Sequence, residues 1–567
     1  MWKSLAPWLL LAAILALFLL YLAWLKPADQ FGWYHDDTIY FSSAQSLAQG
    51  RGYTLPSLPG TPSQTKYPVL YPWLLSCVWR LWPAFPSNVS PAVWMTALFG
   101  CWFLIAAFQL LRKLAGLGDW PALLLVALCA FHPHFLLLSG AILSDIPFLA
   151  LALAAAVVAD SAMRPTARPG LVATTAVLAG LSALMRGFGL PVVAGIVAAG
   201  LFRRAYRQAA LVALLAAPFL AVALLWPAAS PMPAGADSPG WRQTWLFYTS
   251  YGQFWKLSVP RLDVFLAMLG FNLRSFLEAP ASACLFPPPG EGESYAGVLL
   301  CVTLSVAILA GVVRQARMKE WKPIHFIFPF YAPIVLTWNY TLMDRFLLLF
   351  LPLFYAGLWI EGRHFASMLL TSFRQRGPAS QKILAGVLAI GLAVLGIWGV
   401  NYYLRGARGR IRVVAARRAA LAAEKGQLYD WIRRNTDPGA RFIAYEDASL
   451  YLYTARQAAR PIAFSTEAFY KRDEGVLGRD LTHITDTARH IRARYWVASE
   501  DDFHLETGLP MIETRMSRLK SVLPVVFRSR GGKVELLDLS CIFEPDRREC
   551  DAVRPVLFPI ALPPGAP

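Results

Sequence analysis

Two adjacent carboxylates follow a histidine near the N-terminus, in the segment His35-Asp36-Asp37. A carboxylate held beside an apolar surface takes up a proton more readily than one in water, which suits a general base acting on a hydroxyl group. The pair can instead cap a helix that runs to about Gln49 and ends at Gly50. This helix is predicted to be amphipathic, and we expect it on the membrane surface.

A third acid shares the segment HPHFLLLSGAILSDIPF, residues 132–148, with two histidines. The side chains of His132, His134 and Asp145 are of the types that bind metal ions, but their spacing matches no specific zinc motif. Ser144 or Asp145 can equally cap the helix that follows, whose first turn contains a proline. The segment therefore predicts either a polar site at a turn or a plain helix start.

Three cations lie away from the clusters of basic residues, and they could bind an anion. Arg186 interrupts an apolar stretch, Arg345 begins another, and Lys66 precedes an apolar helix. A charge at membrane depth is costly and by default faces the protein interior. The alternatives are an ion pair between Arg345 and Asp344, and a Lys66 that reaches the lipid headgroups as an interfacial anchor. With the acids, these cations predict a cavity for a phosphate and acid–base chemistry.

The composition indicates that these residues belong to a membrane protein. The 567 residues are 56% hydrophobic and 16% charged, whereas soluble chains have roughly 25% charged residues. This excludes an ordinary soluble enzyme and a disordered protein. The 53 basic and 35 acidic residues leave a net charge of +18. In a membrane protein, loops that keep Lys and Arg in the cytoplasm explain such a surplus, so we expect no nucleic-acid partner.

Apolar runs alternate with basic clusters up to residue 401, and pairing the runs between the clusters predicts eleven membrane spans. The predicted spans are residues 1–25, 91–111, 120–138, 146–160, 170–186, 188–202, 208–227, 294–313, 323–338, 346–361 and 382–401. The run 69–82 is shorter than the roughly 20 residues that a span requires and is flanked by prolines. It favours an interfacial or re-entrant helix.

The same counting places residues 26–82 and the C-terminal part on the outer face of the membrane. No run after residue 401 can span a bilayer, and strand-like segments at 441–445, 494–499 and 533–539 predict a soluble α/β domain. We therefore expect a transmembrane domain at 1–401 and an extracytoplasmic domain at 402–567. Six arginines between residues 405 and 418 favour the cytoplasm instead. Cys541 and Cys550 could form a disulfide if the domain is outside.

The outer loop at about residues 227–293 is rich in aromatic side chains. They are Trp241, Trp245, Phe247, Tyr248, Tyr251, Phe254 and Trp255. Such residues are typical of an interfacial belt. They could also line a groove for a prenyl chain or stack on a sugar.

The order of several short motifs resembles the integral-membrane glycosyltransferases of the C-type fold. The acidic pair is followed by A-x-x-L-A-x-G-x-G-Y at 44–53, K-Y-P-V-L-Y-P at 66–72, S-D-I-P at 144–147 and R-F-L-L-L-F-L-P at 345–352. Within that superfamily, the sequence is similar to the bacterial branch akin to protein O-mannosyltransferases and aminoarabinose transferases. The resemblance implies a mainly α, polytopic helical bundle with interfacial helices and a small C-terminal α/β domain.

The resemblance also implies a reaction. A sugar carried on a polyprenyl phosphate would be transferred, with inversion, to a glycan, lipid or protein acceptor at the outer face of a bacterial inner membrane. Asp36 matches the presumed base on the acceptor, Asp37 stands where many members have Glu, and Asp145 matches the acid of the second outer loop. Lys66, Arg186 and Arg345 would bind the donor phosphate, Arg186 where relatives often have Lys.

The remaining expectations concern the groove, the cofactor and the competing function. His35, Tyr40, Tyr67, His132 and His134 are expected to line the substrate groove. The sequence identifies no cofactor, and it leaves open whether the protein binds a divalent cation. The competing function is a transporter, such as a lipid-linked sugar flippase. Transporters often contain internal repeats, and the sequence shows no such self-similarity.

Overall fold

The computed structural model describes residues 2–226, 238–256, 261–284, 295–339, 343–374, 412–503, 516–517 and 520–543, and single positions at 383, 386–387 and 390–391. The chain folds into two compact units. Unit 1 comprises Met1–Ala28, Ser90–Ala223 and Leu269–Ala415; unit 2 comprises Asp29–Val89, Leu224–Met268 and Ala416–Pro567. The predicted domain boundary at residue 401 lies outside the described residues and stays a prediction.

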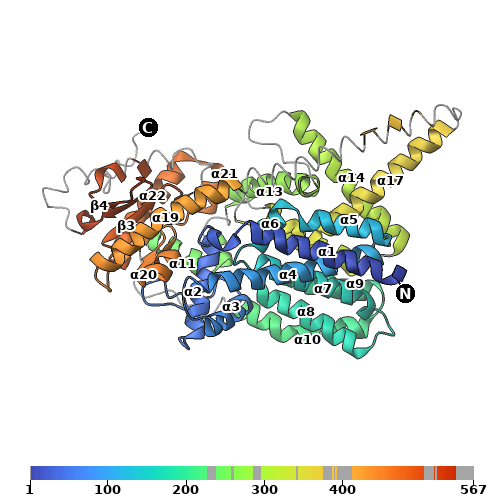
Figure 1. Cartoon of the computed structure of the whole chain (residues 1–567), viewed down its shortest axis with the longest axis horizontal. Helices are drawn as coiled ribbons and strands as arrows, with labels where there is room; N and C mark the ends of the chain where they lie inside the picture. The colour runs from blue at the N-terminus through green and yellow to red at the C-terminus, as the bar shows by residue number, and fades with distance from the viewer. Residues whose placement is uncertain are drawn as a thin grey trace. The chain divides into compact units, whose positions relative to one another are not determined.

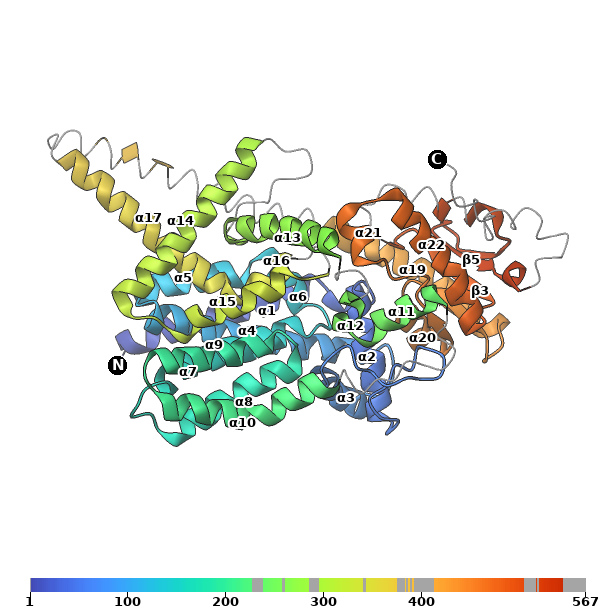
Figure 2. The same ribbon diagram turned by 180° about the vertical axis from the view of Figure 1, so that it is seen from behind.

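Unit 1 is a bundle of apolar helices, which Figures 1 and 2 show running alongside one another. In this bundle α7 packs on α8, α8 on α9, α9 on α15 and α14 on α17. The helices are α1 (Trp2–Trp24), α4 (Val89–Gln109), α5 (Asp119–Ala130), α6 (Pro133–Ser139), α7 (Asp145–Ala162), α8 (Pro169–Met185), α9 (Gly189–Phe202), α10 (Tyr206–Leu225), α14 (Tyr295–Lys319), α15 (Pro323–Leu336), α16 (Met343–Phe346) and α17 (Leu351–Arg374), together with α13 (Leu262–Ala283) from Leu269 onward. A π-helical turn (Leu110–Leu114) extends α4, and a 3-10 turn (Leu347–Phe350) joins α16 to α17.

Five described helices are long and apolar enough to cross a bilayer, so the chain is an integral membrane protein. They are Leu5–Trp24, Val89–Lys113, Asp145–Ala162, Tyr206–Leu225 and Gly297–Lys319. Three other predicted spans form apolar helices of 14 to 17 residues, namely α8, α9 and α15. The predicted span 382–401 lies almost wholly outside the described residues, so the count of eleven spans stays a prediction.

The predicted span 120–138 forms two apolar helices that are long enough together to cross a bilayer, but the chain bends by 62° between α5 and α6. The bend falls at His132 and Pro133. Proline has no N–H for the hydrogen bond that would continue the preceding helix, whereas its fixed φ suits the first turn of a new one. The broken span places the two histidines of this segment at the bend.

Close packing in unit 1 depends on glycine at two helix contacts. A Cβ atom added to Gly311 of α14 would lie 2.0 Å from the carbonyl oxygen of Gly357 in α17. One added to Gly195 of α9 would lie 2.5 Å from the Cα atom of Ile327 in α15. Small residues allow helix backbones to approach in an apolar medium, where dispersion contacts replace the hydrophobic effect. A larger residue at Gly311 or Gly195 would therefore push the paired helices apart.

Unit 2 contains a five-stranded mixed sheet of order β2-β1-β3-β5-β4. Its strands are β1 (Arg441–Ala444), β2 (Gln457–Ala459), β3 (Tyr495–Ser499), β4 (Val525–Arg528) and β5 (Val534–Asp538). β1 pairs in parallel with β2 and β3, and β5 is antiparallel to β3 and β4. The three strands predicted from sequence are β1, β3 and β5, so the small α/β domain is confirmed.

The helices of unit 2 pack on the sheet and on one another. They are α2 (His35–Ala48), α3 (Leu70–Leu81), α11 (Pro239–Thr249), α12 (Tyr251–Trp255), α19 (Arg412–Asn435), α20 (Asp447–Thr454), α21 (Thr466–Lys471) and α22 (Glu474–Ile491), with 3-10 turns at Pro27–Gln30 and Ser540–Ile542. Leu428 and Ile432 of α19 share a buried core with Phe442 and Ala444 of β1. Alternate residues of a strand face the same side of a sheet, so Phe442 and Ala444 lie on one face. α19 packs against this face.

Two segments that were predicted to lie on the outer face fold as helices of unit 2, and one of them differs from the prediction. α3 has 12 residues and exposes Trp73 and Leu81 while it buries Tyr71 and Leu75, as an interfacial helix would. α2 was expected to be amphipathic, but most of its residues are buried, including polar ones such as Ser42 and Ser43. α2 packs against both α3 and α20, and this double packing covers the side that was expected to face water.

Candidate active site

The described structure brings three predicted site residues together in unit 1. Asp145 is the first residue of α7, Arg186 directly follows α8, and Arg345 belongs to α16. Arg186 Nη1 donates a hydrogen bond to Asp145 Oδ2 at 2.6 Å, and Arg345 Nε lies 3.8 Å from Asp145 Oδ1. The three side chains are at most 16% exposed. We call them the acid–arginine cluster.

The helix-cap prediction for this segment is confirmed in its position but not in its hydrogen bond. Ser144 is the N-cap residue of α7 but makes no side-chain cap hydrogen bond there; its hydroxyl accepts one from Arg186 instead, at 3.3 Å. Arg186 and Arg345 also lie over the ring of Phe346, at 5.4 and 5.2 Å from its centroid. Two guanidinium groups around one carboxylate leave a surplus positive charge. The side chain of Asp344 lies outside the described residues.

The two histidines of unit 1 lie at the bend between α5 and α6. His132 is buried, His134 is exposed, and their ring centroids are 5.7 Å apart. Within the described residues, no group of three or more His, Cys, Asp or Glu side chains is arranged to hold a metal ion. The metal interpretation of these histidines therefore has no support from the described geometry.

The acidic pair splits into two environments in unit 2. Asp37 is 1% exposed, and its carboxylate accepts hydrogen bonds from the backbone N–H groups of Gly32, at 3.0 Å, and Thr38, at 2.7 Å. Burial raises its pKa well above the usual value, against these hydrogen bonds. α2 begins at His35 with Tyr34 as the N-cap residue. The prediction that Asp36 or Asp37 caps this helix is therefore wrong. Asp37 holds the turn that leads into the helix.

Asp36 is only partly buried and faces a tyrosine. Tyr67 Oη donates a hydrogen bond to Asp36 Oδ1 at 2.5 Å. The Tyr67 ring packs against Tyr40, with ring centroids 4.6 Å apart. Burial and the Asp36 carboxylate together raise the pKa of Tyr67 well above its usual range, so the tyrosine is a donor to the carboxylate. Asp36 is therefore held in one orientation.

Lys66 is surrounded by aromatic rings, and we call Lys66 with Tyr67, Phe247 and Tyr251 the lysine cage. Its Nζ lies 3.5, 4.4 and 5.3 Å from the ring centroids of Phe247, Tyr251 and Tyr67. It is 7% exposed, and Nζ has no hydrogen-bond partner among the described residues. Burial lowers the pKa of Lys66 to about 7, although the charge of Asp36 opposes the shift. A side chain this buried does not act as an anchor to the headgroups.

The lysine cage also decides between the two interpretations of the aromatic loop. Trp241, Trp245, Phe247 and Tyr248 are at most 9% exposed within the protein. An interfacial belt needs aromatic side chains that face lipid headgroups. The belt interpretation is therefore wrong for these four residues, and Phe247 instead covers an ammonium group.

A hydrogen-bond network that the sequence did not predict lies beside the lysine cage. His35 Nε2 lies 2.6 Å from Asp447 Oδ1, and Ser57 Oγ donates to Asp447 Oδ2 at 3.0 Å. The guanidinium carbon of Arg460 lies 5.1 Å from the centroid of Phe247. Burial lowers the pKa of His35, although Asp447 opposes the shift. His35 and Asp447 are 412 positions apart and belong to no local motif, so no sequence signal could have found this pair.

The predicted site residues thus fall into two groups. Unit 2 brings together His35, Asp36, Tyr40, Lys66 and Tyr67. Unit 1 brings together Asp145, Arg186 and Arg345, with His132 and His134 at the bend between α5 and α6. Each group combines acids with cations in a buried setting, as phosphate and proton chemistry requires.

Comparisons with known proteins bear on the fold. No protein-family model matches the sequence, and no curated protein matches it. The archaeal oligosaccharyltransferase AglB from Archaeoglobus fulgidus, solved with an inhibitory peptide and a dolichol-phosphate, is 14% identical with a TM-score of 0.51; the alignment covers 93% of this chain and 74% of AglB. ArnT from Cupriavidus metallidurans, solved bound to undecaprenyl phosphate, is 13% identical with a TM-score of 0.50, covering 93% of this chain and 97% of ArnT. The chain therefore has the C-type fold of these membrane glycosyltransferases, as its motifs predicted.

Proposed function

We propose that this protein is a glycosyltransferase that moves a sugar from a polyprenyl phosphate to an acceptor at the extracytoplasmic face of a bacterial inner membrane. The observation that carries the proposal is the environment of Asp36 and Lys66. A carboxylate oriented by Tyr67 lies in the same unit as a buried ammonium group whose Nζ has no hydrogen-bond partner among the described residues. The first group suits a general base, and the second suits a leaving phosphate.

The proposed reaction inverts the anomeric carbon. The acceptor oxygen or nitrogen attacks this carbon, Asp36 takes the proton, and the bond to the phosphate oxygen breaks with its electron pair left on the phosphate. Lys66 stabilises the new negative charge on polyprenyl phosphate. Arg186 and Arg345, with their surplus charge over Asp145, are proposed as further phosphate-binding residues.

The comparisons support the choice of substrates. AglB was solved with a dolichol-phosphate, and ArnT with undecaprenyl phosphate. Both ligands are polyprenyl-type phosphates, which is the donor class that the motifs imply. The acceptor can be a glycan, a lipid or a protein, and the inhibitory peptide on AglB does not decide this for the present chain.

The outer location of unit 2 is supported by its cysteine chemistry. Cys541 is disulfide-bonded, whereas Cys550 lies outside the described residues. Disulfides persist in oxidising compartments and are rare in the cytosol. Unit 2 holds both Asp36 and Lys66. An outer location for unit 2 would therefore place the proposed base and the proposed phosphate-binding lysine on the extracytoplasmic side.

The experiment is a transfer assay with the purified protein in lipid vesicles and a radiolabelled polyprenyl-phosphate sugar. Release of polyprenyl phosphate together with labelled acceptor supports the proposal, and movement of intact donor across the bilayer supports a transporter. Asp36→Asn should lower release by about 10²–10⁴-fold, because it removes the base. Asp430→Asn, which changes an exposed acid on α19, should leave release unchanged. Wild-type turnover in Asp36→Asn would refute the role of this residue.

A further inference from the structure

Four exposed arginines lie at one end of the helix bundle in unit 1. Arg164 and Arg168 belong to the loop between α7 and α8, whereas Arg204 and Arg207 lie where α9 leads into α10. The two segments read MRPTAR at 163–168 and RRAYR at 203–207, so neither contains an acid. We call these four exposed residues the arginine patch.

The fold joins the two segments of the arginine patch into one surface. Gln208 Nε2 donates a hydrogen bond to the carbonyl oxygen of Pro165 at 2.8 Å, across 43 positions of the sequence. A Cβ atom added to Gly200 of α9 would lie 2.7 Å from Sδ of Met163, so α9 packs directly against the first segment. The bias of positive charge toward one face of a membrane acts on each loop separately. This bias does not require two basic segments to lie against each other.

The acid next to the arginine patch is already bound by other cations. Asp160 Oδ1 accepts a hydrogen bond from the buried Arg203 Nη2 at 2.8 Å, and Lys322 Nζ lies 3.4 Å from the same oxygen. Arg164 Nη2 lies 3.8 Å from Asp160 Oδ2. The other three arginines of the patch form no ion pair with any acid among the described residues. Like charges that lie close together repel one another, and an anion bound between them removes this repulsion.

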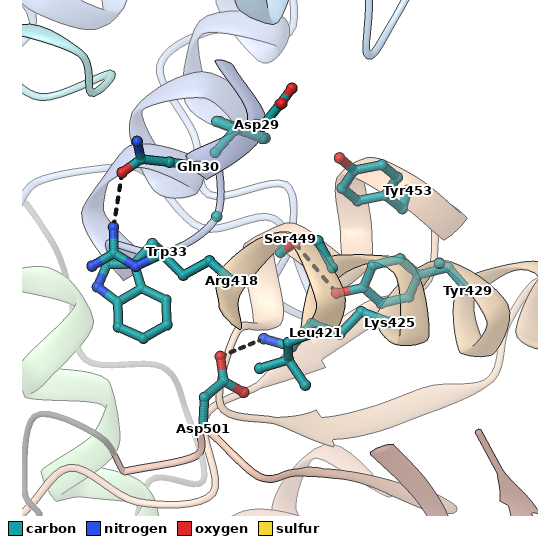
Figure 3. Close-up of a pocket in the computed structure, with 14 residues that line it drawn as sticks. Asp29, Gln30, Trp33, Arg418, Leu421, Lys425, Tyr429, Ser449, Tyr453 and Asp501 are labelled. Carbon is teal, nitrogen blue, oxygen red and sulfur yellow. Dashed lines mark hydrogen bonds and ion pairs between the residues drawn. The ribbon is translucent and has the colours of Figure 1, made fainter. Parts of the chain in front are cut away.

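Two cations of unit 2 show the opposite situation. In the pocket of Figure 3, Arg418 Nη1 donates to Gln30 Oε1 at 3.0 Å, and Lys425 Nζ donates to Asp501 Oδ2 at 2.9 Å. Their hydrogen bonds are thus supplied within the protein. Each exposed guanidinium group of the arginine patch instead presents several N–H donors to its surroundings.

The arginine patch lies where two membrane spans end. α7 ends at Ala162, just before the first segment, and α10 begins at Tyr206, within the second; both helices are long and apolar enough to cross a bilayer. Leu201, Phe202 and Tyr206 are 50%, 61% and 61% exposed. Arginine side chains reach the headgroups from such a position, while apolar neighbours contact the acyl chains. The patch therefore lies at the depth of the lipid phosphates.

A lipid phosphate is the ligand that this chemistry fits. Guanidinium groups bind phosphate oxygens through two parallel hydrogen bonds, and basic pockets between membrane spans bind the headgroups of acidic lipids. A soluble nucleotide would leave the exposed apolar neighbours uncovered, whereas the chains of a lipid cover them. We propose that the arginine patch binds the phosphate of an anionic phospholipid, on the membrane face opposite to Asp145.

The proposed lipid site is separate from the candidate active site. Asp145 and Ala162 are the two ends of α7, whose 18 residues extend over about 27 Å at a rise of 1.5 Å per residue. The patch therefore lies across the membrane from the acid–arginine cluster. No residue of the patch takes part in the proposed transfer reaction, so the inference does not depend on the proposed function.

The test is lipid binding by the purified full-length protein in a neutral detergent, measured by native mass spectrometry. Phosphatidylglycerol and phosphatidylcholine with the same acyl chains are compared, and phosphatidylglycerol should bind about tenfold more tightly. The double variant Arg204→Gln, Arg207→Gln should lose about tenfold in affinity for phosphatidylglycerol and keep its affinity for phosphatidylcholine. The matched control Arg433→Gln, Arg434→Gln changes two exposed arginines of α19 and should bind both lipids as the wild type does.

Three outcomes would overturn the inference. The first is equal affinity for the two lipids, and the second is unchanged affinity for phosphatidylglycerol in the double variant. The third is displacement of phosphatidylglycerol by an equal concentration of glycerol 3-phosphate, which would identify the ligand as a soluble phosphate. A melting curve of each variant separates lost binding from lost folding. A failure of sugar transfer with intact lipid binding would count against the proposed function alone.

Discussion

The acid–arginine cluster of unit 1 and the lysine cage of unit 2 place cations in opposite settings. Arg186 and Arg345 share the carboxylate of Asp145, so an ion pair offsets part of the cost of burying their charge. Nζ of Lys66 has aromatic rings around it and no hydrogen-bond acceptor among the described residues. Aromatic faces attract a cation but replace only part of its hydration.

The difference separates cations that pair with a carboxylate from one whose Nζ has no hydrogen-bond partner among the described residues. Arginine stays charged in proteins, so Arg186 and Arg345 keep their positive charge near neutral pH. Burial lowers the pKa of Lys66 to about 7, so this side chain can gain or lose its proton near neutral pH. Three variants test the comparison, from the largest expected effect to the smallest.

Asp145→Asn should destabilise the protein most, by about 3–5 kcal/mol, because it leaves two buried guanidinium groups without their counter-ion. The measurement is unfolding of the purified protein in mixed micelles by sodium dodecyl sulfate. The matched control is Asp119→Asn, which breaks a half-exposed pair with Arg112 and should cost less than about 1 kcal/mol. Equal losses in both variants would show that the cluster does not depend on Asp145.

Asp447→Asn should cost about 1–3 kcal/mol, because His35 and Ser57 both lose a charged acceptor in a buried site. The same unfolding assay measures it, and a double mutant with His35→Gln should lose less than the sum of the two single losses. Asp430→Asn, a half-exposed acid on α19, should stay within about 0.5 kcal/mol. Additive losses would indicate that His35 and Asp447 do not act as a pair.

The smallest effect concerns the pH dependence of donor binding. The pKa of Lys66 is about 7, so the ammonium form declines as the pH rises, and the donor phosphodiester keeps its charge. Affinity for a polyprenyl-phosphate sugar should therefore fall above pH 7, by at most about tenfold per pH unit. Binding is measured by calorimetry between about pH 6 and 9. Lys66→Arg stays charged over this range and should flatten the profile; an unchanged profile would assign the titration to another group.

Much of the fold could be predicted from local patterns. Long apolar runs identified the helices α1, α4, α7 and α14, and strand-like segments between helical stretches identified β1, β3 and β5. These features follow from burial of a continuous or alternating set of side chains, which depends on neighbouring residues alone. The bend at Pro133 and the burial of α2 were not predicted, because a bend and the burial of both helix faces depend on what packs against the segment.

The candidate site was predictable in its residue types and only partly in its grouping. Motifs identified Asp36, Lys66, Asp145, Arg186 and Arg345, since each is a charge in an apolar or outer segment. The pairing of both arginines with Asp145 was not foreseen, and neither was the role of Phe247 beside Lys66. Such partners come from segments far apart in the chain, so no spacing rule relates them.

The sequence by itself determined that this chain enters a membrane, carries a small α/β region near its C-terminus and contains acids and cations of the types that phosphate chemistry uses. These features can be predicted from the sequence because hydropathy, charge and short motifs depend only on neighbouring residues. Tertiary structure alone decided which charges are paired and which are caged, and it joined His35 to Asp447 across 412 positions. Burial and partner geometry set the energy of a charge, and both depend on contacts that form only when the chain folds.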